Sequence, residues 1–299
     1  MRLIPGRSRT QEPFDPTQPL VATGNLRRRN RVSVLAQGLA VAAAVAAVAV
    51  LVIVILAVVS HGVKAISWDF ITKGEPEGIG PTLVGSGIIV GIATLIAMPI
   101  GVLIALFLTE YSGPRSTRPV QVMMDVMNGL PSIIVAVFVY ILLVANKGQA
   151  GWKASVALAI IEVPLIARGT QEVLNLVPSA QREAADALGV ARWRSVLTII
   201  LPSATGGIVT ATLLSVARAA GETAPVLLIT ALGHGDTFHF NPLEPLPSVP
   251  VKIFQLSEEA NPEGFTEAWG LSLILIAIIL VLGLGSRALL NRSKRKLTQ

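Results

Sequence analysis

Cysteine is absent from this chain of 299 residues, which excludes disulfide bonds and thiolate metal sites. The dipeptide Gly-Lys is absent as well, so the chain has no P-loop with which to bind the phosphates of a nucleotide. Charged residues make up only 14% of the sequence, whereas hydrophobic residues make up 52%. This imbalance is typical of a protein that crosses a membrane several times, and it excludes an ordinary soluble domain.

Long apolar runs predict six membrane-spanning segments. The first covers residues 32–60, and its run Val34–Ser60 is about twice as long as the apolar region of a signal peptide, so we expect an uncleaved helix. The other five lie in a core over residues 81–290, at about 81–109, 122–145, 154–176, 207–232 and 269–290, with long connections at 177–206 and 233–267. Residues 1–31 predict a disordered basic tail, and residues 291–299 a second basic tail.

Glycine and proline interrupt two of these spans. Gly129 and Pro131 predict a kink or a break in the third span. A broken helix near the middle of a membrane is frequent in transport sites, but a packing kink explains the same residues equally well. In the second span, the spacing of Gly87 and Gly91 allows a close helix contact.

Basic residues are distributed unevenly between the two sides of the predicted spans. Six spans place both termini on one side, together with the connections after the second and fourth spans. The opposite connections hold only Lys64, Lys73, Lys147, Lys153 and Lys252. The positive-inside rule therefore predicts that both termini and residues 177–206 are cytoplasmic. The net positive charge thus reflects topology rather than binding to nucleic acid.

Ionisable residues at membrane depth cost at least about 2.5 kcal/mol each and therefore need an explanation. Arg218 lies near the middle of the fifth span, and Glu222 follows four positions later, so we expect the two to share a helix face. They form either a structural ion pair or part of a path for an oxyanion, which the planar guanidinium suits. In the fourth span, Glu162 and Arg168 lie about 240° apart around a helix, so each should find a partner on another helix. Arg168 is a second candidate for the path, whereas Glu162 and Asp125 are predicted to be structural.

The connection between the fourth and fifth spans contains the charged stretch Glu183–Pro202. Its alanines favour a short helix, which Gly189 is predicted to end in the left-handed conformation. A second short helix is predicted from about Ala191 to Leu201, stopping at Pro202. A helical hairpin between two membrane spans is a candidate docking surface for a soluble partner.

This stretch resembles the EAA loop of bacterial ABC importer permeases at Glu183, Ala184, Ala185, Gly189, Ile199, Leu201 and Pro202. In that family the loop inserts into a groove on the ATP-hydrolysing subunit, so the resemblance implies that these residues couple the chain to an ATPase. The segment Ser215–Pro225 resembles the corresponding segment of the PstA family of phosphate transport permeases. This second resemblance covers roughly residues 80–290.

The resemblance implies an all-α polytopic membrane protein with six transmembrane helices, the type I ABC importer permease fold and a cytoplasmic coupling hairpin. It implies a location in the inner membrane of a bacterium and high-affinity import of inorganic phosphate. The implied partners are a homologous permease (PstC), two copies of the ATPase PstB, the phosphate-binding protein PstS and membrane lipid. By position it assigns Arg168, Arg218 and Glu222 to the substrate path, and it implies no catalytic residue, metal or cofactor.

Other functions remain possible from the residues alone. A permease for another oxyanion would carry the same hairpin motif. A secondary carrier would need no docking hairpin and usually shows repeated halves, which are not evident here. A membrane enzyme is disfavoured, because the GxGD match Gly233–Asp236 lies beyond the fifth span, and because His61, His234 and His239 all fall in connections, away from any serine within the membrane.

Overall fold

The computed structural model describes residues 26–259 and 261–297, and every regular element in these ranges is a helix. The predicted all-α fold is thus confirmed. Five described helices are long and apolar enough to cross a membrane, and a bent pair of helices supplies a sixth span. The chain divides into two compact units, Met1–Leu56 and Ala57–Gln299, and each is described by itself.

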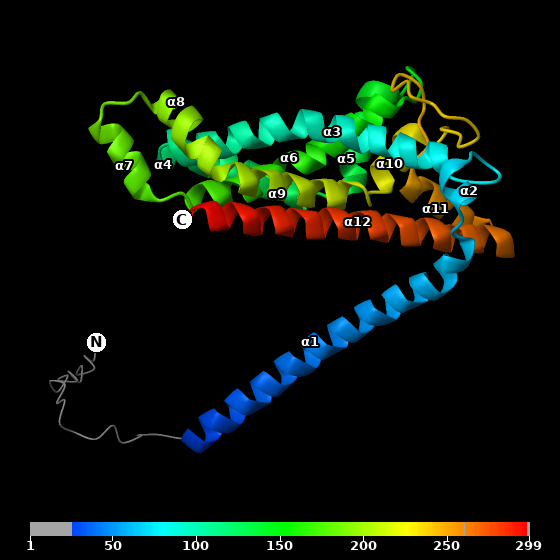
Figure 1. The fold of residues 1–299 in the computed structure, drawn as a ribbon, viewed down its shortest axis with the longest axis horizontal. Helices are drawn as coiled ribbons and strands as arrows, with labels where there is room; N and C mark the ends of the chain where they lie inside the picture. Colours follow the sequence, from blue (N-terminus) through cyan, green and yellow to red (C-terminus); the bar gives the residue numbers. More distant parts are fainter. Residues whose placement is uncertain (1–25, 260, 298–299) are drawn as a thin grey trace, which may run out of the picture. The chain divides into compact units, whose positions relative to one another are not determined.

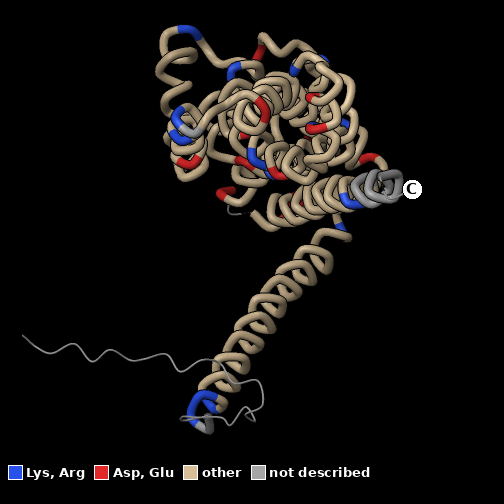
Figure 2. Tube along the Cα trace, turned by 90° about the vertical axis from the view of Figure 1, so that its left-hand side faces the viewer, with Lys and Arg blue, Asp and Glu red and all other residues tan. Residues whose placement is uncertain are grey.

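The described part of the first unit belongs to α1, which runs from Leu26 to Gly62 and enters the second unit after Leu56. Between Arg31 and Lys64 the chain carries no Lys, Arg, Asp or Glu, and Figure 2 shows this stretch of α1 in tan after the blue arginines at its start. The helix begins inside the stretch 1–31 that the sequence predicts to be disordered, because extending a nucleated helix gains a backbone hydrogen bond for each added residue. Residues 1–25 lie outside the described part.

Four long helices build the second unit: α3 (Gly80–Leu106), α6 (Gly151–Asn175), α9 (Leu201–Ala219) and α12 (Pro262–Leu297). α3 packs along α6, α6 packs along α9, and α9 packs along α12 (Figure 1). The buried side chains between α3 and α6 are small or aliphatic, such as Ala93, Ala97, Leu158 and Ile166. The small side chains of Ala93 and Ala97 on α3 leave room for the larger Leu158 and Ile166 of α6.

Gly101 permits a close approach of α3 to α6. A Cβ atom on Gly101 would lie only 2.9 Å from the Cβ of Ile166. Gly87 and Gly91, where the sequence also allows a close contact, have no neighbour within 4 Å of such a Cβ in the described chain. These two glycines instead line an apolar groove of about 610 Å³ between α3, α9 and α12. The tight α3–α6 contact is therefore nearer the C-terminal end of α3.

The third span is broken as Gly129 and Pro131 predict. α4 (Pro114–Gly129) and α5 (Ser132–Val139) meet at an angle of 96°. A π turn, Tyr140–Val144 (η3), extends α5.

The fifth span differs from the single helix predicted over residues 207–232. α9 ends at Ala219, and α10 (Ala224–Thr230) follows after a turn. Pro225 lies in the first turn of α10, where a missing N–H costs nothing because no intrahelical partner exists there. The turn contains Gly221, and it separates Arg218 from Glu222.

The two ends of the bundle carry different structures (Figure 1). At one end, α7 (Ser179–Ala187) and α8 (Arg192–Ser195) form a hairpin. At the other end lie the short helix α2 (Trp68–Thr72) and α11 (Val249–Glu258), which packs against α12. The predicted connection 233–267 therefore contains α11 and the start of α12.

Candidate functional site

The hairpin turns at a glycine. Gly189 has a φ angle of 67°, a left-handed conformation that costs glycine little, so the predicted end of the first hairpin helix is confirmed. Two large apolar side chains are exposed beside this turn, Leu188 at 82% and Trp193 at 57%. On a hairpin that extends from the end of the bundle, these two side chains are candidates for contact with another protein.

The second half of the hairpin continues into a candidate membrane span. A π turn, Val196–Ile200 (η4), joins α8 to α9, so that one helix runs from Arg192 to Ala219. The predicted stop at Pro202 is therefore wrong. Pro202 lies in the first turn of α9, directly after the wider π turn, where neither its ring nor its missing N–H interrupts the helix. Consequently, unbroken backbone connects the hairpin to Arg218.

The motif residues of the hairpin face in different directions. Glu183, Ala184, Gly189 and Pro202 are exposed, Ile199 and Leu201 are half-buried, and Ala185 is buried. α7 packs against η4, and the small side chain of Ala185 suits this contact. The hairpin thus packs through part of its motif and leaves the rest accessible.

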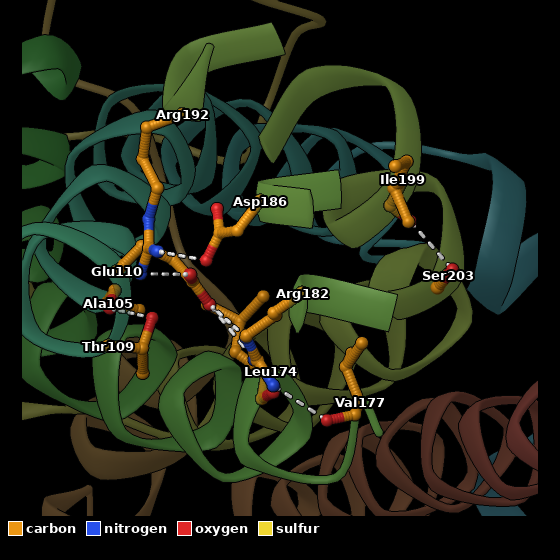
Figure 3. Close-up of polar contacts among 10 residues, drawn as sticks. All are labelled: Ala105, Thr109, Glu110, Leu174, Val177, Arg182, Asp186, Arg192, Ile199 and Ser203. Atoms are coloured by element: carbon orange, nitrogen blue, oxygen red, sulfur yellow. Dashed lines mark hydrogen bonds and ion pairs between the residues drawn. The ribbon is translucent and has the colours of Figure 1, made fainter. Parts of the chain in front are cut away.

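A buried carboxylate joins both halves of the hairpin to the bundle (Figure 3). Glu110 lies in the π turn Phe107–Tyr111 (η2), which extends α3, and its side chain is 0% exposed. Arg182 of α7 donates to Oε1 of Glu110 from Nε at 3.1 Å and from Nη2 at 2.9 Å, while Arg192 of α8 donates from Nη2 to Oε2 at 3.2 Å. We call Glu110, Arg182 and Arg192 the clamp.

The two arginines of the clamp differ in their other contacts. Arg182 also donates to the carbonyl oxygens of Leu174 at 2.8 Å and Val177 at 2.7 Å. Carbonyl groups at a helix C-terminus lack intrahelical partners, and a cation there is favourable, so Arg182 caps α6. Arg192 is more exposed, and its other charged neighbour among the described residues is Asp186 at 3.9 Å.

Sequence reasoning missed the clamp. Glu110 and Arg182 are 72 positions apart, and no local spacing relates them. The available signal was an acidic residue directly after an apolar span, on the side of the membrane where arginines gather. Its position in the sequence does not identify the arginine with which this carboxylate forms an ion pair.

Charged residues within the fourth span find partners on neighbouring helices, as predicted. Arg168 of α6 pairs with Asp125 of α4. Glu162 is fully buried and accepts a hydrogen bond of 3.1 Å from the side chain of Thr94 on α3. Arg168 and Asp125 line a groove of about 260 Å³, and Glu172 lines it too.

Arg218 is only loosely paired. Its Nε atom lies 3.8 Å from Oε1 of Glu222, beyond hydrogen-bonding distance, and its side chain is 59% exposed. The expectation that the two residues share a helix face is wrong, because α9 ends before Glu222, but they remain neighbours. Arg218 lines a groove of about 290 Å³ between α6 and α9, together with Thr210 and Glu172.

The three predicted path residues therefore do not share one pocket. Arg168 and Arg218 line separate grooves along α6, and Glu172 lines both. Arg168 is paired with Asp125, whereas the partner of Arg218, Glu222, lies 3.8 Å away, beyond hydrogen-bonding distance. Of the two arginines, Arg218 is better placed to attract a further anion.

The sequence is similar to one family model and to several known proteins, and these matches agree with one another. Residues 97–299 match the family model described as "binding-protein-dependent transport system inner membrane component". The phosphate transport system permease protein PstA 1 of Mycobacterium tuberculosis is 38% identical over 216 residues, which cover 70% of this chain and 69% of that protein. PstA of Xylella fastidiosa is 35% identical over 276 residues, covering 90% of this chain and 96% of that protein.

One solved structure supports the fold over a still larger share of the chain. A chain of a bacterial alginate ABC transporter, in complex with an alginate pentasaccharide-bound periplasmic protein, has a TM-score of 0.64. The match covers 92% of this chain and 99% of that chain at 15% identity. At this identity the similarity concerns the fold alone.

We predict that Gly189→Val loosens the hairpin and that Gly189→Asn is tolerated. A Cβ at this position meets no atom within 4 Å, so the penalty arises from the backbone, at roughly 1–2 kcal/mol for an ordinary residue in the left-handed conformation. Asn adopts this conformation more readily. Hydrogen–deuterium exchange of the α7 and α8 amides should therefore rise about fivefold or more in the valine variant. Equal exchange in the two variants would contradict the prediction.

Proposed function

The chain belongs to the PstA family of binding-protein-dependent transport permeases, and from this premise we propose that it forms half of the translocation pathway of an ATP-driven, high-affinity importer of inorganic phosphate. The assignment of phosphate as the substrate rests on the 35% identity to a phosphate transport permease over 90% of this chain. The proposed location is the inner membrane of a bacterium. Both termini and the hairpin would face the cytoplasm, which the uneven distribution of basic residues supports.

The proposed assembly contains a homologous permease, PstC, two copies of the ATPase PstB and the phosphate-binding protein PstS. Without a P-loop in this chain, ATP would be hydrolysed by the ATPase subunits, and the chain itself would have no catalytic site. The exposed Leu188 and Trp193 supply apolar surface for one ATPase subunit. The exposed motif residues Glu183 and Ala184 lie on the same hairpin.

Arg218 is the proposed contact for the oxyanion. Its loose pair with Glu222 leaves the guanidinium free to exchange one anionic partner for another, and Glu222 would prevent permanent capture, because a transit site must also release its ion. Arg168 is already paired with Asp125 and would join the path only when that pair opens. In the described conformation it links α6 to the broken third span.

Coupling would be mechanical. Closure of the two ATPase subunits on ATP would displace α7 and α8. Because one helix runs from Arg192 to Ala219, this displacement would reach the groove beside Arg218 and alter access to it. Two discrete packings of the bundle would then give alternating access.

Uptake of radiolabelled phosphate by cells that lack this chain tests the function. Returning the chain should restore ATP-dependent uptake, and excess sulfate should not compete. Restored uptake that sulfate suppresses would indicate a permease for another oxyanion. No difference between cells with and without the chain would refute the phosphate proposal.

Arg218→Ala should lower phosphate uptake about tenfold or more, because a hydrogen bond to a charged group is worth about 1.5–3 kcal/mol. Arg218→Lys should retain part of the activity, since it keeps the charge but loses the planar fork. The ATPase subunit should still co-purify with both variants. If Arg218→Ala disrupts the assembly instead, the residue is a structural partner of Glu222 rather than a contact for phosphate.

Leu188→Asp should reduce co-purification of the ATPase subunit about tenfold or more, as expected for an exposed apolar side chain that becomes buried at an interface. Leu243→Asp is the matched control, since Leu243 is 70% exposed and follows the fifth span, outside the hairpin. Equal recovery of the ATPase with both variants would exclude Leu188 from the docking surface.

A further inference from the structure

The clamp holds the two halves of the hairpin with unequal strength. Arg182 makes four hydrogen bonds and its side chain is 22% exposed. Arg192 donates one hydrogen bond to Glu110 and its side chain is 43% exposed. Glu110 is the acceptor common to both. Its removal would therefore weaken the attachment of both halves, leaving α7 with only the bonds of Arg182 to Leu174 and Val177, whereas removal of Arg192 would affect α8 alone.

The backbone connects the hairpin to the bundle differently on its two sides. On the α8 side the helix is continuous into α9. On the α7 side the chain leaves the helical conformation between Asn175, the end of α6, and Ser179, the start of α7. A non-helical link of this kind transmits a displacement poorly.

The clamp bridges that non-helical link. Arg182 contacts the carbonyl oxygens of Leu174, in α6, and Val177, within the link, and it contacts Glu110 at the end of α3. α3 and α6 pack along each other, so these contacts hold α7 against both helices of that pair. A carboxylate withdrawn from water is stable only when it is paired and hydrogen-bonded, and both oxygens of Glu110 accept hydrogen bonds.

We propose that Glu110 is a positioning residue that carries displacement of the hairpin into α3. The inference rests on the coupling role in the proposed function. Without Glu110, movement of the hairpin still reaches α9 through the helix backbone and α6 through the bonds of Arg182 to Leu174 and Val177, but it loses its direct contact with the end of α3. ATP is then hydrolysed without a matching movement of the whole bundle, and transport becomes uncoupled from hydrolysis.

The test is the ratio of phosphate transported to ATP hydrolysed by the complete complex in lipid vesicles, with the binding protein and phosphate supplied. Glu110→Gln removes the charge and keeps the shape. Arg192→Gln removes one partner, and Arg192→Lys keeps its charge. Arg118→Gln is the control, because Arg118 is an exposed arginine of α4 with no ion pair in the described chain.

Glu110→Gln should lower the ratio about tenfold, within the range found for residues that couple two sites. Arg192→Gln should lower it less, Arg192→Lys should restore at least about half of that loss, and Arg118→Gln should match the unaltered complex. The ATPase subunit should co-purify in normal proportion throughout. Transport and hydrolysis that fall in equal proportion, or a complex that falls apart, would show that the clamp is structural only.

A distance measurement tests the same proposal without relying on activity. Because the chain has no cysteine, spin labels can be placed at Ala187→Cys on the hairpin and Leu103→Cys on α3, both exposed. The distance between the labels should stay constant on ATP binding in the complex and change when Glu110→Gln is added. An equal change with and without Glu110→Gln would overturn the proposal. An unaltered complex that neither hydrolyses ATP nor transports phosphate would instead refute the proposed function.

Discussion

The ion pair between Glu110 and Arg182 lies where α3, α6 and α7 meet, and the placement of the hairpin depends on it. A carboxylate removed from water is costly unless its oxygens are hydrogen-bonded, so this group favours the one arrangement in which two guanidinium groups surround it. Arg182 also donates hydrogen bonds to the carbonyl oxygens of Leu174 and Val177 at the end of α6. The hairpin is consequently attached by side chains as well as by backbone, and it presents Leu188 and Trp193 away from the bundle.

Backbone hydrogen bonding explains where the helices widen and break. At membrane depth a backbone group must be satisfied within the protein, so a departure from the α-helix needs a compensating contact. Two of the π turns, η2 and η4, lie beside the clamp: η2 contains Glu110, and η4 follows α8. Such turns are frequent at functional sites. Here they shift the register of α3 and α9 where these helices meet the hairpin.

The intramembrane charges fall into two groups. Arg168 with Asp125, and Glu162 with Thr94, join helices to one another, which accounts for ionisable residues in an otherwise apolar span. Arg218 differs, because it lies at the end of a helix, half exposed, beside a groove. Glu172 lines the grooves of both arginines, so any anion near Arg218 would also meet a carboxylate that opposes tight binding.

The sequence by itself determined the features that depend on local chemistry. Apolar runs determined the number of spans, Gly129 with Pro131 determined the break in the third span, and Gly189 determined the turn of the hairpin, because each follows from the residue and its immediate neighbours. The same reasoning wrongly predicted that the helix stops at Pro202. The helix continues there, because the preceding π turn accommodates the proline ring and its missing N–H. The turn after Ala219 was missed for a related reason: alanine and glycine tolerate both helix and turn. Only the tertiary structure decided the clamp, the pairing of Arg168 with Asp125 and the separation of the two grooves, because partners 72 and 43 positions apart are brought together by helix packing and by no pattern along the chain.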